Sequence, residues 1–141
     1  MAGIRGSDTR PERIVRGLLH SRGFRYRLNV RSLAGTPDIV LRRFSAAIFV
    51  HGCFWHGHDC PLFRLPATNT EFWLAKIRAN LERDTRNRSL LIRGGWRVLV
   101  VWECALKGPA RLGEDVLGYR VSQWLHASRR SHSIAGRAHR R

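Results

Sequence analysis

Metal-ligating side chains are concentrated in residues 51–60, which have the sequence HGCFWHGHDC. Cys53, His58 and Cys60 lie close together in this segment, and Cys104 is the remaining cysteine of the chain. Thiolates combined with one imidazole form a ligand set suited to tetrahedral Zn²⁺. We therefore predict a structural zinc site, because four protein ligands leave no open position for a substrate.

A second interpretation of these residues needs no metal. The segment has no C-x-x-C pair and its fourth ligand is remote, so the spacing is not that of the common zinc fingers. Cys53 and Cys104 would then be small buried core residues, and His58 a solvated loop residue. Three cysteines cannot all form disulfides, and we find no signal-like amino terminus, so thiols near histidines favour a metal over a disulfide.

Asp38 and His51 are expected to lie at one end of a sheet. Asp38 begins a predicted strand directly after Pro37, and His51 ends the neighbouring strand of a hairpin. A carboxylate beside strand-end carbonyls suits Mg²⁺, which neutralises charge on phosphate oxygens during phosphodiester cleavage. An imidazole can accept a proton from the attacking water. His51 and His56 remain for this role once His58 is assigned to zinc.

Each of these residues also has a structural interpretation. An aspartate beside a proline is most often a turn or strand-start residue, and a lone histidine is usually a packed or solvated polar group. Glu12 lies three residues after Thr9, so the two are predicted to form a capping box at a helix start. Glu12 would matter for chemistry only if this helix packs its start against Asp38.

The apolar pattern and the turn residues predict a small α/β domain with a mixed sheet and helices on its faces. At 141 residues the chain has the length of one ordinary domain. We assign this domain to residues 1–127, with a flexible arm over 1–10 and a disordered basic tail over 128–141. We predict helices within residues 10–22, 68–95 and 112–127, and strands within 24–30, 38–44, 46–51 and 96–104.

The charge of the chain indicates a polyanionic partner. Lys and Arg number 26 against 10 Asp and Glu, which gives a formal net charge of +16. Nucleic acid is the simplest such partner. An anionic membrane surface is the competing explanation, but no apolar run is long enough to cross a bilayer.

Five segments of the sequence closely resemble the very short patch repair (Vsr) endonucleases, a family of DNA mismatch endonucleases. The likeness covers roughly residues 1–108, and its central motif is highly specific. The matching segments are TRPE, GTPDIV, FVHGCFWHGHDC, PATNTEFWLAKIRANLERD and GWRVLVVWECAL.

The resemblance implies a fold related to type II restriction endonucleases and a Mg²⁺-dependent nick in one DNA strand. The nick falls 5′ to the thymine of a T:G mismatch, which arises when 5-methylcytosine deaminates, and it starts repair. The resemblance also implies double-stranded DNA with a T:G mismatch as the partner, with mismatch-repair proteins as further partners and no membrane. We expect a monomer that is cytoplasmic and associated with the bacterial nucleoid.

The family motif implies a role for each catalytic candidate. Asp38 resembles the principal magnesium ligand, assisted by the main-chain carbonyl of Val50, where some members carry a threonine. His56 resembles the general base, His51 a histidine on the phosphate side or a water-positioning group, and Glu12 a supporting acid. The structural zinc falls on Cys53, His58, Cys60 and Cys104.

The resemblance further implies DNA contacts. Phe54, Trp55 and Trp73 match aromatic residues that enter the base stack beside the mismatch, although tryptophans are usually largely buried and a core role is the alternative. Met1 matches a residue of the amino-terminal arm that enters from the other groove. Lys76 and Asn80 lie where the family contacts the mismatched guanine or its neighbours.

Two other functions remain open from the sequence. A zinc-stabilised DNA-binding module without catalysis would keep the basic charge and the zinc ligands but would need neither Asp38 nor His56. A restriction-type endonuclease would cut matched DNA, in both strands if it dimerises.

Overall fold

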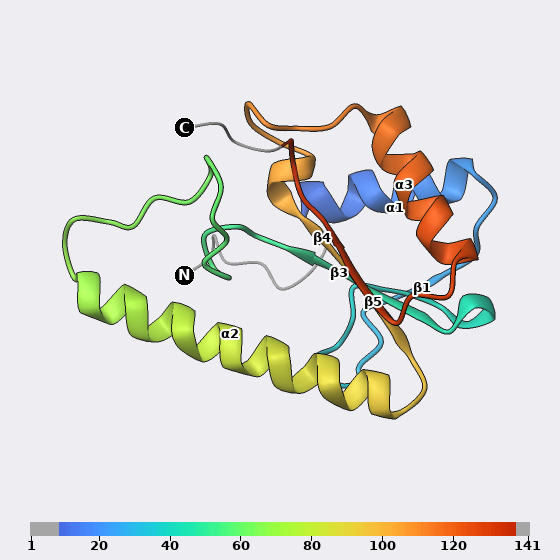
Figure 1. Ribbon diagram of the computed structural model, residues 1–141, viewed down its shortest axis with the longest axis horizontal. Helices are drawn as coiled ribbons and strands as arrows, with labels where there is room; N and C mark the ends of the chain where they lie inside the picture. Colours follow the sequence, from blue (N-terminus) through green and yellow to red (C-terminus); the bar gives the residue numbers. More distant parts are fainter. Residues whose placement is uncertain (1–8, 138–141) are drawn as a thin grey trace.

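The computed structural model describes residues 9–137, which form one five-stranded mixed sheet with helices on both faces (Figure 1). The strand order in the sheet is β1-β2-β3-β4-β5. The elements in chain order are α1 (Arg10–Ser21), β1 (Arg27–Leu28), β2 (Ile39–Leu41), η1 (Arg42–Phe44), β3 (Ala46–His51), α2 (Thr70–Arg93), β4 (Arg97–Trp102), η2 (Glu103–Ala105), α3 (Glu114–His126) and β5 (Ser131–Ile134).

The predicted hairpin is confirmed and sets the direction of the sheet, although its first strand ends at Leu41 and Arg42–Phe44 forms the η1 turn. β2 and β3 pair antiparallel, with Ile39 opposite Ile48, whereas β3 and β4 pair parallel, with His51 opposite Trp102. Parallel neighbours need a crossover connection, and α2 lies in the connection between β3 and β4. The carboxyl ends of β3 and β4 and the amino end of β2 therefore meet at one end of the sheet, called here the site end.

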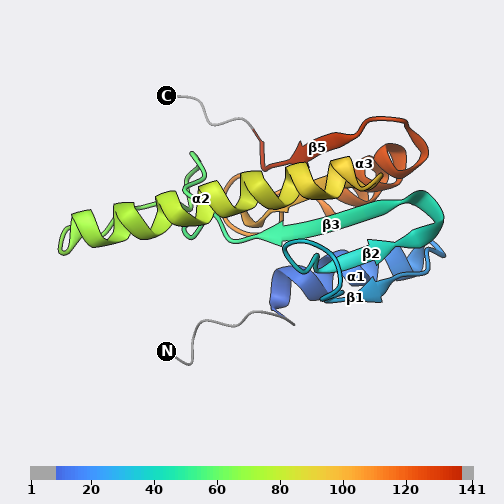
Figure 2. The same cartoon turned by 90° about the horizontal axis from the view of Figure 1, so that it is seen from below.

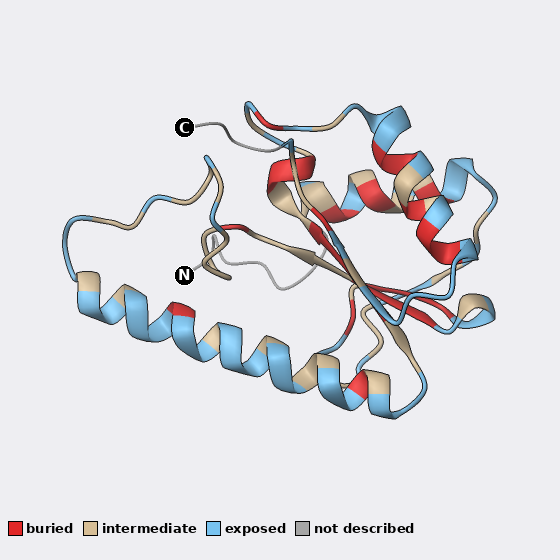
Figure 3. Cartoon of the chain, in the orientation of Figure 1, coloured by how far each residue is buried: buried red, intermediate tan, exposed pale blue. Residues whose placement is uncertain are grey.

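Two apolar clusters attach helices to opposite faces of the sheet. α1 and α3 cover one face and α2 covers the other, with the amino-terminal half of α2 extending past the sheet (Figures 1 and 2). Val15 and Leu19 of α1 pack with Leu117 of α3 in the larger cluster, and Leu91 of α2 packs with Val98 in the smaller one. Most of α2 is exposed or half-buried (Figure 3). No helix within residues 9–137 has the length and apolar character needed to cross a membrane.

The start of α1 is the predicted capping box. Thr9 is the N-cap residue, its hydroxyl oxygen accepts a hydrogen bond from the Glu12 backbone N–H at 3.4 Å, and Pro11 lies in the first turn. The Thr9 hydroxyl also donates to a Glu12 carboxylate oxygen at 3.2 Å. These contacts fix the Glu12 side chain at the helix end nearest the site end of the sheet.

The predicted strand over residues 24–30 is wrong for most of its length. Only Arg27–Leu28 is a strand, and both residues are exposed. Phe24 and Tyr26 instead pack against the edge of the core, and Asn29 adopts a left-handed conformation with φ of 49°. An alternating pattern identifies apolar contacts with the core, but it does not show whether the backbone of the segment pairs with a neighbouring strand.

The predicted disordered tail over residues 128–141 is also wrong in part. Ser131–Ile134 forms β5, which pairs parallel with β4, and Ile134 is fully buried. The SHSI sequence has only one large apolar residue, so its pattern does not predict a strand. It pairs nevertheless, because β4 is apolar along its length and needs a partner on both edges. The arm prediction falls mainly on residues 1–8, and these, Met1 included, lie outside the described residues, as do residues 138–141.

The Arg97 guanidinium joins β4 to the end of α3 and to the η1 turn. It donates hydrogen bonds to the backbone carbonyls of Phe44, Leu125 and Arg129 at 3.1–3.3 Å and to that of Trp124. It also lies 4.2 Å from the centre of the Trp124 ring. Burial lowers the pKa of Arg97. This one side chain satisfies carbonyls at the carboxyl end of α3 that the helix leaves unpaired.

Substitution Arg97→Gln is expected to lower the free energy of unfolding by about 2–4 kcal/mol, because it leaves half-buried carbonyls without donors. Urea unfolding followed by circular dichroism measures this loss. Arg111→Gln is the matched control, because the exposed Arg111 makes one local contact to the Gly108 carbonyl. A loss no larger than that of the control would contradict the proposed role.

Candidate active site and metal centre

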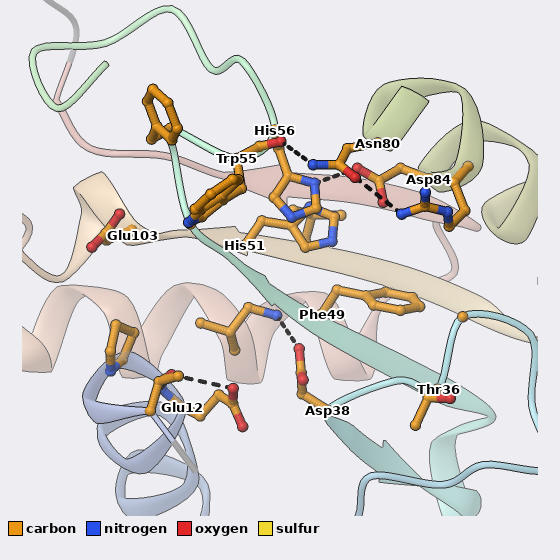
Figure 4. A pocket seen from close by; sticks show the side chains of 18 of the residues that line it. Glu12, Thr36, Asp38, Phe49, His51, Trp55, His56, Asn80, Asp84 and Glu103 are labelled. Atoms are coloured by element: carbon orange, nitrogen blue, oxygen red, sulfur yellow. Dashed lines mark hydrogen bonds and ion pairs between the residues drawn. The ribbon is translucent and has the colours of Figure 1, made fainter. Parts of the chain in front are cut away.

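A hollow of about 1170 Å³ opens at the site end of the sheet (Figure 4). Its walls come from the start of α1, the turn before β2, the strands β3 and β4, the loop after β3, the middle of α2 and η2. It is therefore assembled from residues far apart in the sequence. It contains Glu12, Asp38, His51, His56, Asp84 and Glu103 among its lining residues.

Asp38 occupies the base of this hollow at the amino end of β2. Its carboxylate accepts a hydrogen bond from the Val50 N–H at 2.7 Å. Burial raises the pKa of Asp38 to about 7; the Val50 hydrogen bond opposes this shift, and the negative charge of Glu12 adds to it. Glu12 is itself only 6% exposed. The start of α1 thus does pack near Asp38, which was the condition for a catalytic role of Glu12.

His51 and His56 lie face to face above Asp38. Their ring centres are 3.8 Å apart and the rings are parallel within 2°. The pKa of His51 is lowered to about 3, mainly by burial and secondly by the neighbouring His56, while Asp84 opposes the shift. His51 is consequently neutral across the physiological range and can donate or accept a hydrogen bond at a phosphate or a water molecule.

Asp84 is a site residue that our sequence reasoning missed. Its carboxylate contacts the Nδ1 atom of His56 (Figure 4). Lys76, Asn80 and Asp84 recur every four residues along α2 and all line the hollow. This period places them on one face of the helix, and a run of polar residues on one helix face was the available signal.

The carboxylate of Asp84 sets the orientation of His56. With Nδ1 directed at Asp84, the other ring nitrogen, Nε2, is left to accept a proton. The loop that carries His56 lies against α2, where Gly57 has φ of +59° and a Cβ atom would come within 2.8 Å of Ile77. Asn80 holds the same loop by donating to the Trp55 carbonyl at 2.8 Å.

The predicted zinc ligands converge in a second cluster beside the hollow. The ligand atoms of Cys53, His58, Cys60 and Cys104 all lie within 4.8 Å of one another. The Sγ atoms of Cys53 and Cys104 are each 3.6 Å from Nδ1 of His58. All three cysteines are free, and burial raises the pKa values of the Cys53 and Cys104 thiols.

This geometry favours the metal interpretation over the core interpretation. Cys53 and Cys104 are indeed buried, but His58 is not a solvated loop residue. Its ring stacks on Trp102 with 4.1 Å between centres, and its Nδ1 atom is directed at two thiols. Three thiols and an imidazole at such spacing can hold one tetrahedral metal ion after deprotonation of the thiols.

The three aromatic residues expected to contact DNA form one cluster. The ring centres of Phe54, Trp55 and Trp73 lie 5.0–5.7 Å from one another. All three are half-buried and belong to neither core cluster, which disfavours the core role considered for the tryptophans. Phe63 and Phe72 extend the cluster at its edges, and our sequence reasoning had not assigned them to it.

The two other predicted DNA-contact residues on α2 have different environments. Lys76 is exposed at the rim of the hollow. Asn80 is half-buried and its amide is committed to the loop that carries Trp55. The hollow therefore combines acidic groups at its base, histidines on one wall and aromatic and basic groups at its rim, which is an arrangement suited to phosphodiester hydrolysis in nucleic acid.

A mixed α/β sheet of this type with such a site at its end defines a restriction-endonuclease-like nuclease. The family model for the DNA mismatch endonuclease Vsr matches residues 1–62. The chain is 48% identical to the DNA mismatch endonuclease Vsr of Escherichia coli (strain K12) over 125 residues, which is 89% of this chain and 80% of that protein.

Two further relatives are named nicking enzymes. The type II nicking enzyme V.XorIIP of Xanthomonas oryzae is 51% identical over 75% of this chain and 78% of its own length. The type II nicking enzyme V.NmeAIP of Neisseria meningitidis is 48% identical over 78% of this chain and 79% of its own. The chain belongs to the Vsr family of DNA mismatch endonucleases, and it is a DNA nicking endonuclease.

Substitution Asp84→Asn is expected to reduce the nicking rate by a factor on the order of 10²–10⁴ without unfolding the protein. The amide cannot stabilise a positive charge on His56 as the carboxylate does. Single-turnover nicking of a mismatched duplex measures this effect, and Glu82→Gln, an exposed carboxylate on the same helix, is the control. A rate for Asp84→Asn equal to that of the control would remove Asp84 from the catalytic group.

Cys60→Ser and His56→Ala are expected to separate the metal centre from the hydrolytic groups. Structural zinc contributes roughly 10–16 kcal/mol in zinc-finger peptides, so loss of one ligand should cost about 3 kcal/mol or more and reduce nicking as well. His56→Ala should lose nicking but keep its bound metal and its unfolding temperature. Thermal unfolding and metal content measured on both variants test this, and loss of the fold in both would contradict the assignment.

Proposed function

We propose that this endonuclease nicks one strand of duplex DNA 5′ to the thymine of a T:G mismatch that arises from deamination of 5-methylcytosine. The observation that carries the proposal is the position of the aromatic cluster beside the histidine pair and Asp38. Phe54 and Trp55 line the same hollow as these groups. A group that opens the base stack is thereby held next to groups that can cleave the neighbouring phosphodiester bond.

The acidic base of the hollow fits a hard divalent cation, and we propose Mg²⁺. Glu12 is buried and Asp38 half-buried in one hollow, and desolvation together with the charge of Glu12 raises the pKa of Asp38, so a divalent cation bound there would stabilise the ionised carboxylates. Asp38 and the Val50 carbonyl are the proposed ligands, with Glu12 supporting them. When bound, the ion would neutralise the charge that grows on the phosphate oxygens.

The side chains of the hollow divide the remaining work of hydrolysis. His56 would accept the proton of the attacking water at Nε2, because Nδ1 is directed at Asp84. The Asp84 carboxylate would then stabilise the imidazolium. His51 lies 3.8 Å from the His56 ring and stays neutral, so it can orient the water or a phosphate oxygen without adding a competing charge.

The aromatic cluster supports a preference for a mispair. Inserting side chains between bases costs a few kcal/mol per step, and the cost is lowest where pairing is already weak. Phe54, Trp55 and Trp73 would enter the stack as one packed unit, and Lys76 and Asn80 would contact bases nearby. Met1 is proposed to reach the other groove from the amino-terminal arm.

For the second cluster we propose a structural Zn²⁺ held by Cys53, His58, Cys60 and Cys104. The donor set of three thiols and one imidazole is the set that Zn²⁺ prefers, and it provides four ligands, so no ligand position remains for DNA. We also propose that the enzyme acts as a monomer on cytoplasmic, nucleoid-associated DNA, with mismatch-repair proteins as further partners and no membrane.

The two alternatives from the sequence are less well supported. A non-catalytic DNA-binding module would have no use for the contact between His56 and Asp84 or for the neighbouring carboxylates of Glu12 and Asp38. A restriction-type enzyme on matched DNA would have little use for an aromatic cluster that opens the base stack.

Purified protein with Mg²⁺ is expected to nick a T:G duplex in one strand and to leave the T:A duplex intact. Asp38→Ala should abolish the nick while retaining DNA binding, because it removes the proposed metal ligand and leaves the aromatic cluster intact. Denaturing gel electrophoresis measures the nick, and a mobility shift measures binding. Equal cleavage of both duplexes would refute the mismatch preference, and no cleavage with any divalent metal would favour the non-catalytic module.

A further inference from the structure

A second hollow, of about 740 Å³, lies away from the active site and is lined by arginines. It is formed by the turn after α1, β1, the η1 turn and the carboxyl end of α3. We call it the arginine hollow. Its charged lining residues are Arg22, Arg25, Arg27, Arg42 and Arg43, all of them exposed.

The arginine hollow lies at the end of the sheet opposite the active site. The chain passes from Asp38 along β2 to Arg42, so the two residues lie at opposite ends of that strand. α1 likewise runs from Glu12 at the active site toward Arg22, about 15 Å along the helix axis at 1.5 Å per residue. In Figure 1 this end holds the η1 turn and β1, at the right of the view.

Charge is divided unequally between the two ends. The active site combines four carboxylates, those of Glu12, Asp38, Asp84 and Glu103, with six Lys and Arg side chains in its lining. No residue that lines the arginine hollow is acidic. Five cationic side chains around one concavity without a neutralising carboxylate repel one another, so the concavity is suited to a polyanion.

The chemistry of the arginine hollow favours phosphate groups over an acidic protein surface. Guanidinium groups form paired hydrogen bonds with phosphate oxygens. A protein partner would need apolar anchors at the centre of its interface. Among the exposed large apolar side chains of residues 9–137, only Leu28 is adjacent in sequence to a lining residue, and Phe24, Tyr26 and Phe44 are packed against the core.

We propose that the arginine hollow is a second DNA site, which holds the phosphate backbone of a DNA segment other than the one in the active site. The segment can belong to a second duplex or to a distant part of the same duplex. Such a site would be independent of base sequence, because its exposed arginines offer charge and no fixed pattern of donors for base edges. It would keep the enzyme on DNA while the active site is released from one segment.

The double variant Arg42→Gln/Arg43→Gln tests this proposal. The control is Arg111→Gln/Arg137→Gln, which removes two exposed positive charges near the start of α3, outside the arginine hollow. Both variants should fold as the unchanged protein does, and both should nick a short T:G duplex at the same rate as the unchanged protein. Protein bound to an immobilised T:G duplex is then offered a second, labelled, matched duplex over a range of salt concentrations.

We expect the unchanged protein and the control to capture the labelled duplex and the Arg42/Arg43 variant to lose most of this capture. Loss of two phosphate contacts should also reduce the slope of log affinity against log salt by about 1.8. If the hollow holds a distant part of the same duplex, the variant should instead lose affinity only for a T:G duplex several times longer than the active-site footprint.

Two results would overturn the proposal. The first is a variant that matches the control in both capture and long-duplex affinity. The second is an Arg42/Arg43 variant that binds DNA as the unchanged protein does but binds poly-glutamate less well. This result would assign the arginine hollow to an acidic protein partner.

Discussion

The parallel pairing of β3 with β4 is the constraint on which both functional clusters depend. His51 and Trp102 lie side by side at the ends of these strands, so the loop after β3 and the η2 turn after β4 begin at the same place. This is why Cys53, in the loop, meets Cys104, in the turn. A metal held between them would fix the loop, and with it the positions of His56 and the aromatic cluster.

The end of β3 and the loop after it, residues 51–60, carry three kinds of group in alternation. Cys53, His58 and Cys60 belong to the candidate metal centre, His51 and His56 face the hollow of the candidate active site, and Phe54 and Trp55 join the aromatic cluster. A short loop can present side chains in three directions only if its backbone is held from several sides. The thiol cluster, the Asn80 amide and the close packing of Gly57 on α2 provide these restraints.

The electrostatics of the active site follow from burial more than from net charge. A net charge of +16 would be expected to lower the pKa of a carboxyl group. The pKa of Asp38 is nevertheless raised, because desolvation and the nearby Glu12 have the larger effect. The same desolvation lowers the pKa of His51. The excess of arginine thus favours attraction of DNA at long range, while the ionisable groups of the hollow respond to their immediate surroundings.

The sequence by itself determined the hairpin, the capping box at Thr9, the long helix before β4 and the membership of the cysteine and histidine cluster, because each depends on local spacing or on residue types with few uses. Only the tertiary structure decided three other features. Asp84 meets His56 through the packing of α2 on the sheet. β5 forms from a weakly apolar segment because β4 needs a partner on its open edge. The arginine hollow collects residues from α1, β1, η1 and α3, and no local pattern shows that separate segments will surround one concavity.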